Sequence, residues 1–137
     1  MSPLSPRKLD PYSHERLQSL FLLVFESVRQ GQRAIASEAH GRFMVAFDSH
    51  MGQEEEVLFP VYVDAGATPG EVEARAREVE DLRRQHGQLR ALAGEIAVRL
   101  REGQADIDLL TRFELDWARH DDAEASGFHA WCDASGR

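Results

Sequence analysis

Four histidines and two glutamates are the residues of this sequence whose types and spacing are best suited to chemistry. They are His14, His50, Glu54, His86, His120 and Glu124. Each histidine interrupts an apolar stripe with helical spacing on a different expected helix, and each glutamate follows a histidine by four residues. Such a stripe normally faces a protein core, where an unpaired polar group costs several kcal/mol. The pattern therefore predicts a metal ion inside a bundle of four helices, and it favours two ions over one.

The elements that must position these residues are four helices joined by short turns. The first should begin at an Asp10-Pro11 cap and end near Gly31, the second should run from about Arg33 to Val63, the third from the Thr68-Pro69-Gly70-Glu71 capping box to Gly103, and the fourth from an Asp106 cap until it frays near Gly127. The buried stripe of the second helix should contain His40, Phe43, Phe47, His50, Glu54, Val57 and Val61. No segment has a strand pattern, so the fold class is all-α: an antiparallel up-down-up-down four-helix bundle. A flexible arm (residues 1–10), the bundle (residues 11–132) and a tail (residues 133–137) make up the expected domain organisation.

The turns allow the depth of each histidine in the bundle to be compared. In an antiparallel pair, residues equally far from the shared turn lie at the same level. His14 and His50 are equally far from a turn centred near residue 32. His86 and His120 differ by two residues in their distance from a turn near residue 104, which is about 3 Å along a helix. All four are therefore expected in one layer, with the glutamates one turn further along.

A histidine on a core stripe can also be a structural residue whose ring nitrogens are hydrogen-bonded. That alternative requires every one of the six polar groups to find a partner inside a narrow core, so the metal is the more economical interpretation. Two other histidines are expected outside the centre: His40, about 15 Å along its helix from His50, as a helix-end or core residue, and His129 at the surface. The acidic neighbours in Glu55-Glu56 and Asp121-Asp122 should mostly be solvated, although two or three could orient imidazole rings.

The type of ligand limits the metal and its chemistry. Imidazole and carboxylate groups without sulfur suit iron, manganese or zinc. Two glutamates could each bridge two ions and the histidines divide between them, while an oxo, hydroxo or water bridge would leave a position open for a small ligand. The apolar neighbours expected to keep the centre dry, so that only O2, NO or peroxide enter, are Phe21, Phe47, Leu89, Phe113 and Trp117.

The composition excludes several classes of function. A chain of 137 residues suits one domain with a core of its own. The formal net charge of −8 argues against a nucleic-acid partner. The single cysteine, Cys132, excludes internal disulfides and thiolate clusters and fits a reducing compartment. Because we find neither a secretory signal nor an apolar run of about 18 residues, no membrane partner is expected and the location should be cytoplasmic.

The same residues resemble the hemerythrin-like, HHE cation-binding family. The most specific stretch, His50-Met-Gly-Gln-Glu54-Glu-Glu-Val-Leu-Phe59-Pro60, is similar to the family's H-x-x-x-E-E-E-x-L-F-P signature. His14 and His86 match the family's first-helix and third-helix histidines, and His120-Asp-Asp-Ala-Glu124 matches the closing H-x-x-x-E. The resemblance covers roughly residues 10–131. It implies a four-helix bundle around a non-haem di-iron centre, bridged by Glu54 and Glu124 and by an oxo or hydroxo group.

The sequence departs from the oxygen-carrying members of that family in three places. Their third helix carries H-x-x-x-H, whereas Arg90 stands at the second position here, and a cationic arginine cannot ligate iron. Their last helix carries H-x-x-x-x-D in place of the glutamate at +4. The family's E-x-x-L-F-P echo after the last motif is replaced by Ala125-Ser-Gly-Phe-His-Ala. The four-histidine, two-glutamate set is closer to members linked to iron sensing and to NO or peroxide responses.

Three functions are compatible with these residues. The leading hypothesis is a di-iron protein that binds or senses O2, NO or iron itself. The alternative is an enzyme that turns over peroxide, NO or Fe(II) at the same centre. A third interpretation is an interaction module in which the metal only stabilises the bundle. Zinc or manganese could also occupy the site in vitro, and the sequence does not identify any protein partner.

Overall fold

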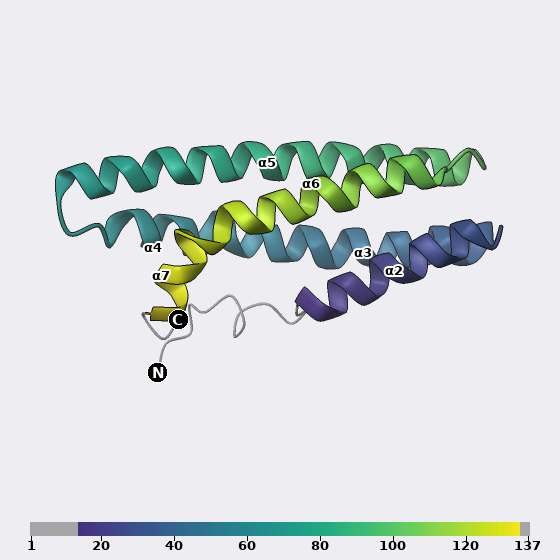
Figure 1. The fold of residues 1–137 in the computed structure, drawn as a ribbon, viewed down its shortest axis with the longest axis horizontal. Coiled ribbons are helices and arrows are strands. Elements are labelled where there is room, and N and C mark those ends of the chain that lie inside the picture. Colours follow the sequence, from purple (N-terminus) through teal and green to yellow (C-terminus); the bar gives the residue numbers. More distant parts are fainter. Residues whose placement is uncertain (1–13, 135–137) are drawn as a thin grey trace.

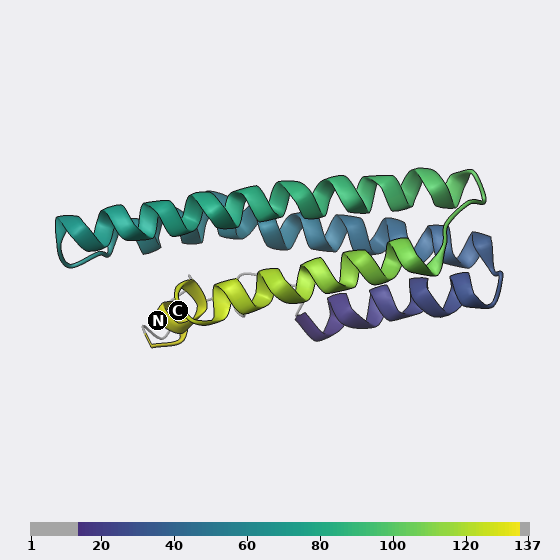
Figure 2. The same cartoon turned by 45° about the horizontal axis from the view of Figure 1, so that its top comes forward.

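Helices of alternating direction, lying along one long axis, form the predicted four-helix bundle (Figure 1). The computed structural model describes residues 14–134. In chain order the elements are α2 (His14–Arg29), α3 (Arg33–Gln53), the π-helical turn η1 (Glu54–Leu58), α4 (Phe59–Asp64), α5 (Pro69–Arg101), α6 (Ile107–Ala125) and α7 (Phe128–Ala134). No strand occurs within residues 14–134. Because α3, η1 and α4 follow one another without a break, they make up the second long helix. In the turned view, α3 lies beside α5 and α2 beside α6 (Figure 2).

Local sequence signals set the limits of these helices. Gly31 and Gly103 have φ values of 71° and 69°, a conformation that residues with a Cβ rarely adopt, and they end α2 and α5. The Thr68 hydroxyl accepts the backbone N–H of Glu71 at 3.1 Å at the start of α5. The Asp106 carboxylate caps α6 in the same way, at 2.8 Å from the N–H of Leu109. These four boundaries were predicted from the sequence and are confirmed.

The π-helical turn interrupts the second helix at the start of the polar layer. The backbone N–H of Phe59 donates to the carbonyl of Glu54, five residues earlier. The next residue, Pro60, has no N–H with which to continue this pattern, and the Arg83 side chain donates to the carbonyl of Glu55 instead, at 2.8 Å. Turns of this kind are frequent at functional sites.

This turn contains one residue more than an α-helical turn, so it shifts the buried face by one position. The prediction that Val57 and Val61 continue the buried stripe was wrong: Val57 is 37% exposed, and Val61 is only partly buried. The residues that face the core instead are Leu58, Phe59 and Tyr62. Glu54, at the start of the turn, keeps its predicted place on the inner face.

Two apolar clusters fill the bundle, one on each side of a polar layer. The larger contains the five predicted apolar neighbours, Phe21, Phe47, Leu89, Phe113 and Trp117, together with Phe43 and aliphatic residues. The smaller contains Leu58, Phe59, Tyr62, Val79, Leu82, Phe128 and Cys132. In the larger cluster the Phe21 and Phe113 ring centroids are 5.1 Å apart, and Phe43 contacts both rings. The five residues are therefore buried together as predicted, while their role in keeping the centre dry stays a prediction.

Residues 128–134 are helical where the sequence predicted fraying. After Gly127, α7 bends away from α6 and packs against α4 (Figure 1). Phe128 is fully buried, with its ring centroid 4.8 Å from that of Phe59. The prediction of fraying was wrong because these long-range contacts stabilise α7.

Several predictions about the two ends of the chain concern residues that the structure does not describe. The predicted arm (residues 1–10), the Asp10-Pro11 cap and residues 135–137 of the tail fall outside the described residues. The domain limits at residues 11 and 132 stay predictions. Within the part of the chain that the structure describes, no helix combines the length and apolar character needed to cross a membrane.

Candidate metal centre

The polar layer between the two apolar clusters contains four buried ionisable side chains. They are Glu54, His86, His120 and Glu124, and each exposes 4% of its surface or less. One potential ligand atom from each residue lies within 4.8 Å of the others. The first residue of η1, the middle of α5 and the last two turns of α6 thus bring four of the six predicted ligands together.

His86 and His120 face each other at the middle of this cluster. Their Nε2 atoms are 3.1 Å apart, while the Nδ1 atom of each ring is already hydrogen-bonded. His86 Nδ1 donates to Glu55 Oε2 at 2.8 Å, because a carboxylate only accepts, and His120 Nδ1 lies 2.7 Å from the side-chain oxygen of Gln85. When neutral, both rings therefore carry their lone pair on Nε2. Two lone pairs at this distance repel each other unless a cation or a shared proton lies between them.

Two carboxylates complete the cluster and add further electron pairs. Glu54 Oε1 is 3.2 Å from His86 Nε2, and Glu124 Oε1 is 3.3 Å from His120 Nε2. Both oxygens of Glu124 are buried and have no donor in hydrogen-bond geometry among the described residues. Burial raises the pKa of Glu124, but the neighbouring His120 and His129 outweigh it and lower the pKa to about 2. This carboxylate is therefore ionised at neutral pH and available to a cation.

Arg90, one turn after His86 on α5, orients His86 through Glu55. Its Nη1 and Nη2 atoms donate to the two oxygens of Glu55, both at 2.9 Å, and its Nε donates to Asp48 at 2.9 Å. Burial raises the pKa of Glu55, but the hydrogen bonds from Arg90 and His86 lower it overall. Burial also lowers the pKa of His86, to about 4, so the ring is neutral at pH 7. Hydrogen bonds of this kind fix the tautomer and orientation of metal-binding histidines.

The other two predicted ligands lie at the edge of the cluster. His50 Nε2 is 3.7 Å from Glu54 Oε2, and its side chain is 17% exposed. The His14 side chain is 45% exposed rather than buried, and its Nε2 lies 3.1 Å from the Asp121 carboxylate. The hydrogen bond with Asp121 raises the pKa of His14. A role for His14 and His50 as ligands stays a prediction, while Asp121, like Glu55, orients an imidazole.

The two histidines expected outside the centre have different environments. His40 is buried, and its Nε2 donates to the carbonyl of Ala93 at 2.8 Å, so its interpretation as a core histidine is confirmed. His129 was expected at the surface, and its side chain is 33% exposed, but its ring also reaches the polar layer. Its Nε2 is 3.3 Å from Glu54 Oε2 and 3.4 Å from Glu124 Oε1. The apolar pair Phe128 and Cys132, four residues apart beside it, was the available signal that this segment forms a packed helix.

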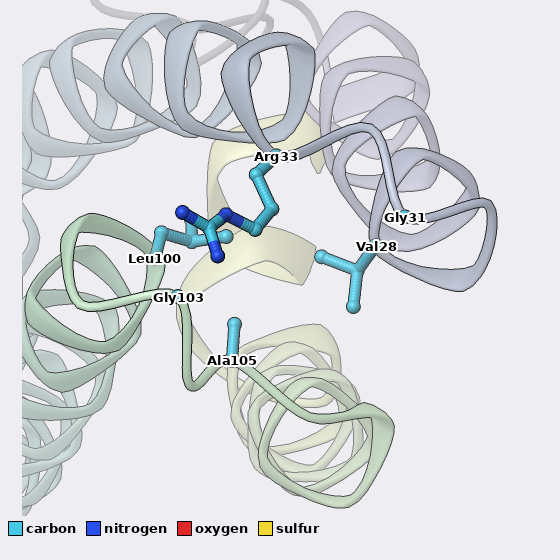
Figure 3. A pocket seen from close by; sticks show the side chains of 6 residues that line it. All are labelled: Val28, Gly31, Arg33, Leu100, Gly103 and Ala105. Carbon is cyan, nitrogen blue, oxygen red and sulfur yellow. The ribbon is translucent and has the colours of Figure 1, made fainter.

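Two pockets show where small molecules could approach. A pocket of about 250 Å³ borders the centre and is lined by Gln85, Gln88, Leu89, Asp116, Arg119 and His120. Another, of about 130 Å³, lies at the end of the bundle formed by the α2–α3 and α5–α6 turns, where the Arg33 guanidinium extends toward Gly103 (Figure 3). No carboxylate or imidazole lines the second pocket. Only the pocket beside His120 is therefore relevant to the polar layer.

The donor set fits a metal ion. Imidazole nitrogens and carboxylate oxygens without sulfur suit iron, manganese or zinc, and a bound cation would resolve both the facing lone pairs and the unsatisfied oxygens of Glu124. In comparisons with known proteins, residues 12–132 match the hemerythrin HHE cation binding domain. No curated protein and no solved structure gave a match. The match covers most of the chain, and the four-helix bundle and the buried cluster of histidines and glutamates able to hold a metal agree with it. The chain therefore belongs to the hemerythrin HHE cation-binding domain family.

Proposed function

We propose that the protein holds two iron ions, with a bridging oxo or hydroxo group, and binds or senses O2, NO or iron itself at this centre. The proposed ligands are His14, His50, Glu54, His86, His120 and Glu124. The observation that carries the proposal is the convergence of two imidazole Nε2 atoms and two buried carboxylates in the core. The two carboxylates of this cluster balance the charge of one divalent ion, and the proposed oxo bridge would balance that of the second.

Different residues of the chain would balance the charge of the ions, orient the imidazole ligands and exclude water. Glu54 and Glu124, on facing helices, supply the negative charge that offsets the ions. Glu55 and Gln85 hold the Nδ1 atoms of the two central imidazoles, which keeps both Nε2 atoms directed at the centre. The apolar clusters on either side exclude bulk water. Iron, when bound, supplies the redox and ligand-binding chemistry.

Reconstitution with Fe(II) under anaerobic conditions, followed by ultraviolet-visible spectroscopy, tests this proposal. We expect two irons per chain, charge-transfer bands of an oxo-bridged di-iron centre after oxidation, and spectral changes with azide or NO. Glu124→Gln should lose metal, whereas the exposed Glu114→Gln is a matched control on the same helix and should not. Absence of metal from the reconstituted wild type, or a spectrum indifferent to every ligand, would contradict the proposal.

An enzyme acting on peroxide, NO or Fe(II) is the alternative, and the pocket beside His120 gives a substrate of that size an approach to the centre. Repeated turnover of peroxide or NO by the reconstituted protein, lost in Glu54→Ala, would establish catalysis. Formation of a single stoichiometric adduct would support the binding role instead.

A further inference from the structure

The short helix α7 brings a fifth histidine to the polar layer. His129 Nε2 lies 3.3 Å from Glu54 Oε2 and 3.4 Å from Glu124 Oε1, so a single ring nitrogen faces two carboxylates at nearly equal distances. Those carboxylates come from η1 and α6, and each is 1% exposed. An ion shared between them would have His129 Nε2 within reach.

The position of His129 is set by contacts that hold α7 against the bundle. The backbone N–H of Phe128, its neighbour, donates to Glu78 Oε2 at 3.0 Å. The hydroxyl of Tyr62 donates to the other oxygen of Glu78 at 2.6 Å. A Cβ at Gly127 would overlap the Glu78 carboxylate, so glycine permits this close approach. These contacts fix the first turn of α7, from which the His129 ring extends toward the centre.

Helix α5 carries an arginine, not a second histidine, one turn after His86. Arg90 occupies the position one turn after His86, and its three nitrogens are engaged by Glu55 and Asp48. The third helix therefore supplies one imidazole to the polar layer. His129 adds another from a separate element, and a neutral imidazole adds a ligand atom without changing the charge of the two carboxylates.

We propose that His129 is a further ligand of the metal centre, supplied by α7, so that metal binding also ties the C-terminal helix to the bundle. This inference rests on the proposed function, because it needs a metal at the centre. It extends the predicted set of four histidines to five, with the fifth placed on a different element from the third-helix histidine that Arg90 replaces.

Zinc titration of the 15N-labelled full-length protein, followed by NMR of the imidazole nitrogens, tests the proposal without relying on any activity. We expect the His129 Nε2 resonance to shift on zinc binding together with those of His86 and His120. In competition with a chelator, His129→Gln should bind zinc at least about tenfold more weakly than wild type, since even the loss of a residue that only orients a ligand typically has an effect of that size. The matched control is Asp133→Asn, an exposed change on the same helix, and it should bind as wild type does.

The outcomes separate this inference from the proposed function. Zinc binding by wild type, with an unmoved His129 resonance and unchanged affinity in His129→Gln, would overturn the role of His129 and leave the metal centre intact. Absence of zinc binding by wild type would overturn both. Circular dichroism of each variant controls for folding, and the NMR readout on wild type needs no variant.

Discussion

Acidification should destabilise the metal-free protein through His86. This side chain has no exposed surface, and its burial lowers the pKa from 6.5 to about 4 in the folded chain. In the unfolded chain the pKa returns to about 6.5. Between these two values the unfolded chain binds more protons than the folded chain, so the free energy of unfolding falls as the pH falls. From neutral pH to about pH 5 the loss from this one group is about 2 kcal/mol.

His40 adds to this loss, because burial lowers its pKa as well. The pKa values of Glu55 and Glu124 are lowered by folding, so the stability they contribute is lost only at lower pH. His14 acts in the opposite direction, because its raised pKa favours the folded state as the pH falls. Its side chain is nearly half exposed, and solvent screening reduces that contribution.

Urea unfolding in the presence of a chelator, followed by circular dichroism, measures this effect. Wild type should lose at least about 2 kcal/mol between about pH 7.5 and about pH 5. The His86→Gln variant, which lacks this ring but keeps His40, should lose about 2 kcal/mol less than wild type over the same interval. Equal stability of wild type at both pH values, or an equal loss in the variant, would refute the assignment of the effect to His86.

Two further predictions follow from the contacts around the centre. Glu55→Gln should weaken metal binding about 10- to 100-fold in a chelator competition, because the hydrogen bond that orients His86 becomes weaker. Glu56→Gln, at an exposed neighbouring position, should bind metal as wild type does. Equal affinities of the two variants would show that Glu55 does not orient His86 for metal binding. Gly127→Ala should lower the urea midpoint, because the added methyl group displaces the Glu78 carboxylate from α7, whereas Gly87→Ala, on α5 with open space around it, should stabilise by up to about 1 kcal/mol. A stabilising Gly127→Ala would show that the approach of Glu78 carries no cost.

Local signals explain why the helices and four clustered ligands could be predicted. Gly31 and Gly103 require positive φ, and Asp106 caps a helix with its own side chain, so each boundary depends on a few adjacent residues. The +4 spacing of Glu54 and Glu124 places each on the same face as its histidine. Each of these signals involves residues only a few positions apart, so it can be recognised in a single sequence.

Features that depend on distant residues could not be predicted in the same way. Glu55 is distinguished from the exposed Glu56 by Arg90, which lies 35 positions further along the chain. The π-helical turn that begins at Glu54 shifts the buried face by one position. The spacing of apolar residues in the sequence could not show this shift, because reading that spacing assumes an unbroken α-helix. His129 follows a break at Gly127, and its place near the centre depends on the packing of α7 against Glu78 and α4.

Anomalous diffraction at the iron absorption edge, from crystals of the iron-reconstituted protein, would show directly whether the bundle holds two iron ions. We predict two anomalous peaks inside the bundle, both contacted by Glu54 and Glu124, with the Nε2 atoms of His86 and His120 directed at them. Peaks confined to the protein surface, or a single ion in the core held without the two glutamates, would contradict this prediction.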